Sequence, residues 1–183
     1  MPGAPDAHAN VLLLCTGNAA RSVMAGYMVD RRAQDRALVL GVRTAGTHVV
    51  EGQPMSMRTR AGLAAVRELG DVPAGSHRSH QLTTEDLEWA DLVVVMEADH
   101  VRFVRRHHPD AAGRTATLRR LCRDLPPGPE ALDRRVAGLK LEGAELEGWE
   151  DVADPAGGEV PDYVACAQEL WSLCGELVGL LGG

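Results

Sequence analysis

Four consecutive apolar residues, Val11–Leu14, lead directly into a cysteine and a short polar loop, after which a helical pattern begins. A continuous apolar run of this length is typical of a strand that is buried on both faces of a parallel sheet. Parallel strands need helical crossovers, so this junction restricts the chain to an α/β arrangement. It also places Cys15 at the carboxyl end of the strand, where ligands bind in open α/β sheets.

Strand and helix patterns alternate along the rest of the chain, after a leader at residues 1–8. We predict strands over residues 9–15, 37–45, 91–96 and 115–118. We predict helices over residues 56–69, 98–108 and 162–181, and two further helices that begin at Ala20 and at Thr83. Alternation of this kind implies right-handed crossovers. We therefore expect an α/β fold with three layers, in which helices cover both faces of a central four-stranded parallel sheet and a phosphate-binding loop follows the first strand.

The length of 183 residues is that of a single domain, so we assign residues 1–183 to one domain. The alternation of strand and helix patterns stops at residues 124–150. There Pro126-Pro127-Gly128-Pro129 marks a loop, and a short helix is expected at about residues 130–140. We predict a loop and short-helix insertion there. Whether it forms a lid is left open.

Composition excludes several classes of function. The net charge of −7 disfavours binding to nucleic acid or to an anionic membrane. No apolar stretch approaches the length of a membrane span, and the N-terminus lacks the pattern of a secretory signal. Four widely spaced cysteines contain no CxxC pair, and no carboxylate or cysteine completes a metal site around the histidines. We expect a cytoplasmic protein without a metal or cofactor, either a monomer or a weak homodimer.

The loop after the first strand combines a nucleophile with an anion site. Successive backbone N–H groups and the following helix N-terminus favour an oxyanion, which the Arg21 guanidinium can grip through two oxygens. The same field stabilises a thiolate at Cys15. Ser22 is placed to donate to that sulfur, and Asn18 to hold the loop. The predicted phosphate-binding loop consists of Thr16, Gly17, Asn18, Ala19, Ala20, Arg21 and Ser22.

Asp154 is the best candidate for a second catalytic group. A thiolate that attacks a phosphomonoester needs an acid to protonate the leaving oxygen and later a base to activate water. One carboxyl group can serve both steps. Pro155 favours an extended Asp154, and the glycines at 157 and 158 let this loop fold over a pocket.

These motifs together identify a family. The chain resembles the low-molecular-weight protein-tyrosine phosphatases over most of its length. The resemblance rests on the Cys-Thr-Gly-Asn-x-x-Arg-Ser loop, Thr44–Thr47, His77-x-x-x-Gln81-Leu82-Thr83, the strand Ala90–Met96 and a late Asp154-Pro155.

The resemblance implies a phosphomonoester hydrolase that needs no metal. Cys15 is then the nucleophile that forms a cysteinyl phosphate, Arg21 binds the phosphoryl oxygens, and Asp154 is the general acid and base. Asn18, Ser22 and His77 match residues that support the loop in this family. The implied substrate is a phosphorylated protein or a small phosphomonoester.

The departures from the family pattern concern redox protection and substrate. Ala20 stands where many members have a second cysteine, and His80 replaces a usual arginine. Members that hydrolyse phosphotyrosine usually have an aromatic side chain directly after the Asp-Pro and a second one in the loop after the second strand, where each forms a wall of the substrate site. Here Ala156 and His48-Val49-Val50 stand at those two places. We therefore expect a non-aromatic or small phosphate as substrate. Trp149 can replace the lost aromatic side chain beside His48 and Val49, although a packing role suits it better.

Two alternatives use the same loop. An arsenate reductase would bind arsenate there, but Cys122, Cys166 and Cys174 form no obvious thiol relay, so an external thiol would be required. A non-catalytic phosphate-binding module would keep the loop and lose the chemistry.

Overall fold

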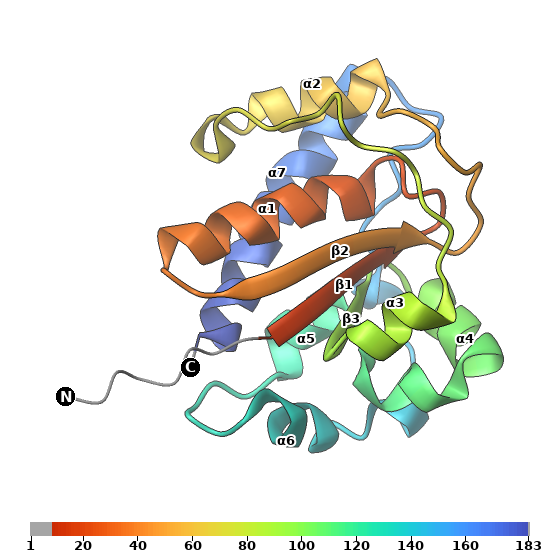
Figure 1. Cartoon of the computed structure of the whole chain (residues 1–183), viewed down its shortest axis with the longest axis vertical. Coiled ribbons are helices and arrows are strands. Elements are labelled where there is room, and N and C mark those ends of the chain that lie inside the picture. Colours follow the sequence, from red (N-terminus) through yellow and green to blue (C-terminus); the bar gives the residue numbers. More distant parts are fainter. Residues whose placement is uncertain (1–8, 183) are drawn as a thin grey trace.

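The fold is built on a four-stranded sheet in the order β2-β1-β3-β4, with every neighbouring pair parallel. The computed structural model describes residues 9–182, so the leader predicted at residues 1–8 lies outside the described residues. The register pairs Cys15 with Gly46, and Leu14 with Val95. The carboxyl ends of the strands therefore meet at one edge of the sheet (Figure 1). The strands are β1 (Ala9–Cys15), β2 (Leu40–Gly46), β3 (Leu92–Val95) and β4 (Thr115–Thr117).

Helices connect the strands and cover both faces of the sheet (Figure 1). The α-helices are α1 (Arg21–Asp35), α2 (Met57–Ala65), α3 (Thr84–Trp89), α4 (Ala98–His107), α5 (Leu118–Asp124), α6 (Leu132–Ala137) and α7 (Val160–Leu181). Short 3-10 helices are η1 (Arg67–Leu69), η2 (Pro109–Arg114), η3 (Leu141–Gly143) and η4 (Gly148–Glu150).

The two faces of β1 belong to two separate apolar cores. Val11 and Leu13 pack with side chains of α1 and α7, whereas Leu12 and Leu14 pack with side chains of α3 and α4. All four are fully buried, because successive residues of a strand point to opposite faces and both faces are covered. The expected three-layer α/β fold is confirmed.

Three differences from the predicted element boundaries each have a local reason. Leu118, predicted in the fourth strand, instead begins α5, because Thr117 Oγ1 accepts a hydrogen bond from the Arg120 amide and caps that helix. The second strand begins at Leu40 rather than residue 37, since Ala37 has a left-handed φ of 53° after α1. The helix predicted over residues 56–69 divides into α2 and η1, because the backbone is extended at Val66.

Residues 124–150 pack onto the domain. Val136 of α6 and Leu141 of η3 are buried in the larger core. Arg135 donates to the backbone oxygens of Pro126 and Leu180, which ties α6 to the end of α7. That this segment is an insertion stays a prediction.

Within the described residues, one helix has the length and hydropathy of a membrane span, contrary to the sequence-based expectation that none approaches it. Helix α7 has 22 residues and a window of mean hydropathy 1.3. Its buried face, which includes Leu170, Cys174 and Leu177, contributes to the core against α1 and α2. Packing of this face in the core accounts for much of its apolar composition.

Candidate active site

The phosphate-binding loop lies between the end of β1 and the start of α1. Cys15 and Arg21 are almost fully buried at its two ends. The backbone of Gly46 at the end of β2 approaches the loop so closely that a Cβ there would lie 2.5 Å from the Thr16 oxygen. Only glycine fits this contact, which fixes the end of β2 against the loop.

Asn18 organises the loop from inside. Its side chain is fully buried, and its φ of 48° is a left-handed conformation that asparagine tolerates. The His80 amide donates to Asn18 Oδ1 over 2.9 Å, so the amide nitrogen of Asn18 must face the other way. There Nδ2 donates to Ser22 Oγ and Thr44 Oγ1, each at 3.0 Å.

This network orients the hydroxyl of Ser22. Because Ser22 Oγ accepts from Asn18, its own hydrogen is free to point elsewhere. The Cys15 sulfur lies 3.0 Å from Ser22 Oγ. The hydroxyl can therefore donate to a Cys15 thiolate, as the sequence analysis expected.

Two side chains hold the backbone oxygen of Asn18. His77 Nε2 and Ser79 Oγ both lie 2.9 Å from it. Since a carbonyl oxygen only accepts, both groups donate. Burial lowers the pKa of His77, and its hydrogen bond to Asn18 opposes that shift only in part. A neutral imidazole that carries its hydrogen on Nε2 thus supports the loop.

Arg21 is held in place by three acceptors. Its Nη2 lies 2.9 Å from Glu97 Oε1 and 2.8 Å from Asp154 Oδ2, and Nη1 donates to the Val152 oxygen over 3.0 Å. Its Nε is buried without a hydrogen-bond partner in residues 9–182. An unpaired buried donor is costly. An oxyanion bound in the loop would satisfy it.

The segment that carries Asp154 is hydrogen-bonded to the residues that come after β3 in the chain. The Val152 amide donates to the Met96 oxygen over 2.8 Å, and Asp151 Oδ1 accepts from the Ala98 amide over 2.7 Å at the start of α4. The Asp154 side chain is 40% exposed, and its second oxygen accepts from the Ala156 amide. The carboxyl group is thus fixed beside Arg21 yet open to solvent.

One small pocket of about 150 Å³ brings the predicted catalytic side chains together. Cys15, Arg21 and Asp154 all line it. The remaining lining residues are Gly17, Ala19, Ala20, Ser56, Thr59, Ala156 and Tyr163. The one aromatic side chain among these lining residues, Tyr163, is only 7% exposed.

The proposed replacement walls do not line this pocket. Trp149 stacks on Arg123, with its ring centroid 3.8 Å from the guanidinium carbon, and donates to Glu147. His48 lies against Phe103, 5.5 Å between ring centroids, and lines a different pocket. The Val49 amide donates to Gln81 Oε1. In the structure Trp149 has the packing role.

Sequence reasoning missed Glu97, Tyr163, Ser56 and Thr59. Glu97 comes two residues after the end of β3, so its place at the carboxyl edge of the sheet was a usable signal. Thr59 donates to the Ala19 oxygen over 2.9 Å, which binds α2 to the loop. Tyr163 looks like an ordinary core residue of a long helix, and no sequence signal distinguishes it.

Two histidines outside the pocket, His100 and His80, contact the phosphate-binding loop. Thr16 Oγ1 lies 2.9 Å from His100 Nε2, and burial lowers the pKa of His100 to about 3. At His80, burial acts to lower the pKa, but hydrogen bonds to Asp86 and Glu51 outweigh it and raise the pKa overall. His100 is therefore neutral, whereas His80 is stabilised as a cation.

Burial disfavours the thiolate form of the other cysteines. Burial raises the pKa of Cys122 and of Cys166 to about 12, and it raises the pKa of the fully buried Cys174 as well. Residues 9–182 contain no group of three or more His, Cys, Asp or Glu side chains placed to hold a metal ion.

Comparison with known proteins identifies relatives over most of the chain. A protein-arginine-phosphatase of Geobacillus stearothermophilus is 30% identical and covers 91% of this chain and 92% of its own length. A low molecular weight protein-tyrosine-phosphatase of Streptomyces coelicolor is 32% identical, over 86% of this chain and 84% of the relative.

Solved structures agree with these relatives. The YwlE arginine phosphatase from Geobacillus stearothermophilus superposes with a TM-score of 0.69 at 29% identity, over 93% of this chain and 90% of that one. Residues 10–126 match the sequence profile of the low molecular weight phosphotyrosine protein phosphatases. The chain therefore belongs to the low molecular weight protein-tyrosine phosphatase family and is a cysteine-dependent phosphatase.

Proposed function

We propose that this phosphatase uses Cys15 as nucleophile, Arg21 as phosphoryl ligand and Asp154 as general acid and base. The observation that carries the proposal is that all three side chains line one pocket, where the buried Arg21 Nε lacks a partner among the described residues. An oxyanion over Cys15 would take that donor together with the backbone N–H groups of the loop.

The first step transfers the phosphoryl group to sulfur. The Cys15 thiolate forms an S–P bond while the bond from phosphorus to the leaving atom breaks, and Asp154 gives its proton to that atom. In the second step, the Asp154 carboxylate takes a proton from water as the water oxygen attacks phosphorus. The S–P bond breaks, which releases inorganic phosphate and restores the thiolate.

We propose a substrate phosphorylated on a non-aromatic group, with phosphoarginine in a protein as the first candidate and a small alkyl phosphate as the second. The pocket lining includes Ser56, Asp154 and Ala156 and contains no exposed aromatic ring. Two arginine phosphatase relatives match 91% and 92% of this chain, and the Streptomyces coelicolor tyrosine phosphatase matches 86%. We retain the expectation of a cytoplasmic setting.

The test is a phosphate-release assay over phosphoarginine, phosphotyrosine, alkyl phosphates and an aryl phosphate. We expect Cys15→Ser to abolish turnover and the control Cys122→Ser, whose sulfur lies outside the pocket, to retain it. Asp154→Asn should lower kcat for alkyl phosphates by about 10²- to 10⁴-fold, and much less for an aryl phosphate whose leaving group needs no proton. Wild-type turnover by Cys15→Ser would refute the mechanism, and a preference for phosphotyrosine would refute the substrate.

An arsenate reductase with an internal thiol relay is disfavoured. Such a relay needs thiolates, and burial raises the pKa of Cys122 and Cys166 to about 12. Arsenite production that requires only these cysteines, without added thiol, would contradict this conclusion. A binding-only module is not favoured either, because the chain belongs to an enzyme family and the pocket keeps all three groups.

A further inference from the structure

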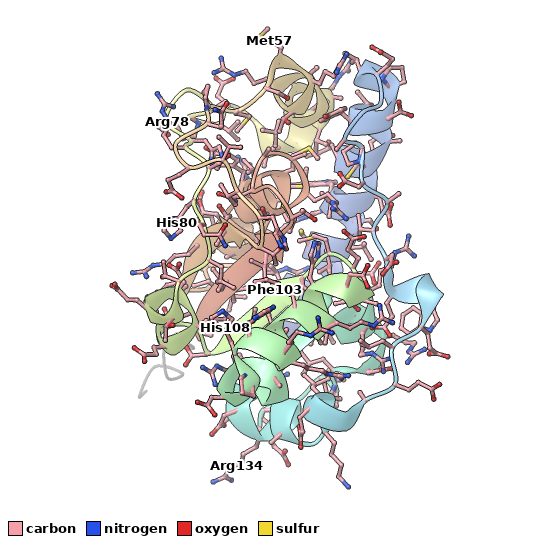
Figure 2. The ribbon with its side chains drawn as sticks, turned by 90° about the vertical axis from the view of Figure 1, so that its right-hand side faces the viewer. Met57, Arg78, His80, Phe103, His108 and Arg134 are labelled. Atoms are coloured by element: carbon pink, nitrogen blue, oxygen red, sulfur yellow. The ribbon has the colours of Figure 1, made fainter. Side chains whose placement is uncertain are left out.

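A second, larger pocket of about 450 Å³ opens beside the phosphate-binding loop. Phe103 of α4 lies in it, near the middle of the face shown in Figure 2, which is the face toward which the carboxyl ends of the strands point. The pocket is lined by Thr16, Thr47, His48, Glu97, Asp99, His100, Arg102, Phe103, Arg106 and His107. Its size suits a side chain together with part of a backbone.

Two residues that line this pocket lie next to catalytic side chains. Thr16 is the first residue of the loop after Cys15, and Glu97 is the carboxylate that binds Arg21. The second pocket is therefore adjacent to the loop over which the phosphoryl group would sit.

The charges in the pocket leave Arg106 free. Glu97 pairs with Arg21, which it shares with Asp154, and the Asp99 carboxylate pairs with Arg102. Arg106 is exposed and forms no ion pair with any carboxylate in residues 9–182. Its neighbour Arg105 is committed elsewhere, because it donates to the backbone oxygens of Leu141 and Ala144.

Aromatic and imidazole side chains complete the lining. The Phe103 ring lies 4.7 Å from the His107 ring and 5.5 Å from the His48 ring, measured between centroids. Both histidines are exposed, so their N–H groups can donate to an anion beside Arg106. The buried His100 adds no positive charge, because its pKa is lowered to about 3.

We propose that this pocket binds an acidic side chain of a protein substrate, so that preferred phosphorylation sites carry Asp or Glu within a few residues of the phosphorylated residue. Arg106 supplies the charge that attracts the carboxylate, and His48 and His107 supply donors. The inference rests on the proposed function, because it assumes that the phosphoryl group occupies the Cys15 loop.

The test uses matched phosphopeptides that differ only in their flanking residues, Asp in one and the isosteric, neutral Asn in the other. In the wild-type protein we expect kcat/KM to be about fivefold higher for the Asp peptide, the factor that one partly exposed ion pair provides. Arg106→Ala should reduce this ratio to below about twofold, and Arg106→Glu should bring it below one. High salt should weaken the wild-type preference.

Two controls separate this inference from the catalytic proposal. Arg134→Ala removes an exposed arginine of α6, which lies at the lower end of the face in Figure 2, away from Phe103. This variant should leave the ratio unchanged. A small aryl phosphate lacks a flanking group, so its kcat/KM should stay within about twofold of wild type in every arginine variant.

Three results would overturn the inference while leaving the catalytic proposal intact. They are equal rates for the two peptides in the wild-type protein, an unchanged ratio in Arg106→Ala, and turnover of the small phosphate without turnover of any peptide. Absence of turnover with every substrate would refute the proposed function and this inference together.

Discussion

Replacement of Asn18 tests whether the loop depends on the side chain at its centre. The side chain makes three hydrogen bonds, to the His80 amide, Ser22 and Thr44. At about 1 kcal/mol each, their loss costs about 3 kcal/mol. In Asn18→Ala the left-handed φ of 48° adds about 1–2 kcal/mol of strain. We expect a total loss of about 4–5 kcal/mol from the free energy of unfolding, measured by urea denaturation.

Asn18→Gly separates strain from hydrogen bonding. It loses the same three bonds but accepts the positive φ without strain, at an entropic cost of about 0.5–1 kcal/mol. We therefore expect Asn18→Gly to be more stable than Asn18→Ala by about 0.5–1 kcal/mol. The matched control is Asn10→Ala, which removes the chain's other asparagine and one side-chain bond, from Nδ2 to the Trp89 oxygen.

The same variants report on the thiolate. Without Asn18 Nδ2, the Ser22 hydroxyl no longer has a fixed acceptor role, and its hydrogen is not directed at Cys15. We expect alkylation of Cys15 by iodoacetamide at neutral pH to slow about tenfold in both Asn18 variants and to stay unchanged in Asn10→Ala. If Asn18→Ala unfolds within 0.5 kcal/mol of wild type, or its thiol is alkylated at the wild-type rate, the reasoning about this network is wrong.

Two further predictions concern buried charge. Glu150 is fully buried and receives two hydrogen bonds from the mostly buried Arg120, so Glu150→Ala should lower the free energy of unfolding by about 3–5 kcal/mol in a urea experiment. The control Asp35→Ala breaks an exposed ion pair with Arg31 and should lower it by less than about 1 kcal/mol. At His100, burial lowers the pKa to about 3, so between about pH 6 and 4 the unfolded chain takes up a proton there that the folded protein does not. Stability should therefore fall by about 1.4 kcal/mol per pH unit from this group as the pH drops, and His100→Gln should remove that slope; equal slopes in both proteins would contradict the assignment.

The strands and the loop could be predicted because local patterns determine them. The apolar run Val11–Leu14 pairs on both sides and is buried on both faces, and the Gly-Asn turn gives the left-handed residue that the loop requires. That Asp154 lies beside Cys15 could be predicted from the chemistry that a thiolate needs and from its Pro-Gly context. Each inference rests on residues that are close in sequence.

The missed features depend on contacts between distant residues. Trp149 lies away from the pocket because Glu150 pairs with Arg120, 30 positions earlier, and Trp149 stacks on Arg123 of the same helix. Tyr163 lines the pocket only because α7 packs across α2. Neither packing arrangement leaves a periodic signal in the sequence.

The charge balance around Arg21 explains why one of its two carboxylates is suited to be the acid. Glu97 and Asp154 share a single buried guanidinium, so this cluster is already negative before substrate arrives. A phosphoryl dianion beside two carboxylates is unfavourable unless one of them carries a proton. Asp154 lines the pocket of Cys15 and is 40% exposed, whereas Glu97 does not line it. We therefore propose that Asp154, rather than Glu97, delivers the proton to the leaving group, while Glu97 keeps Arg21 in position.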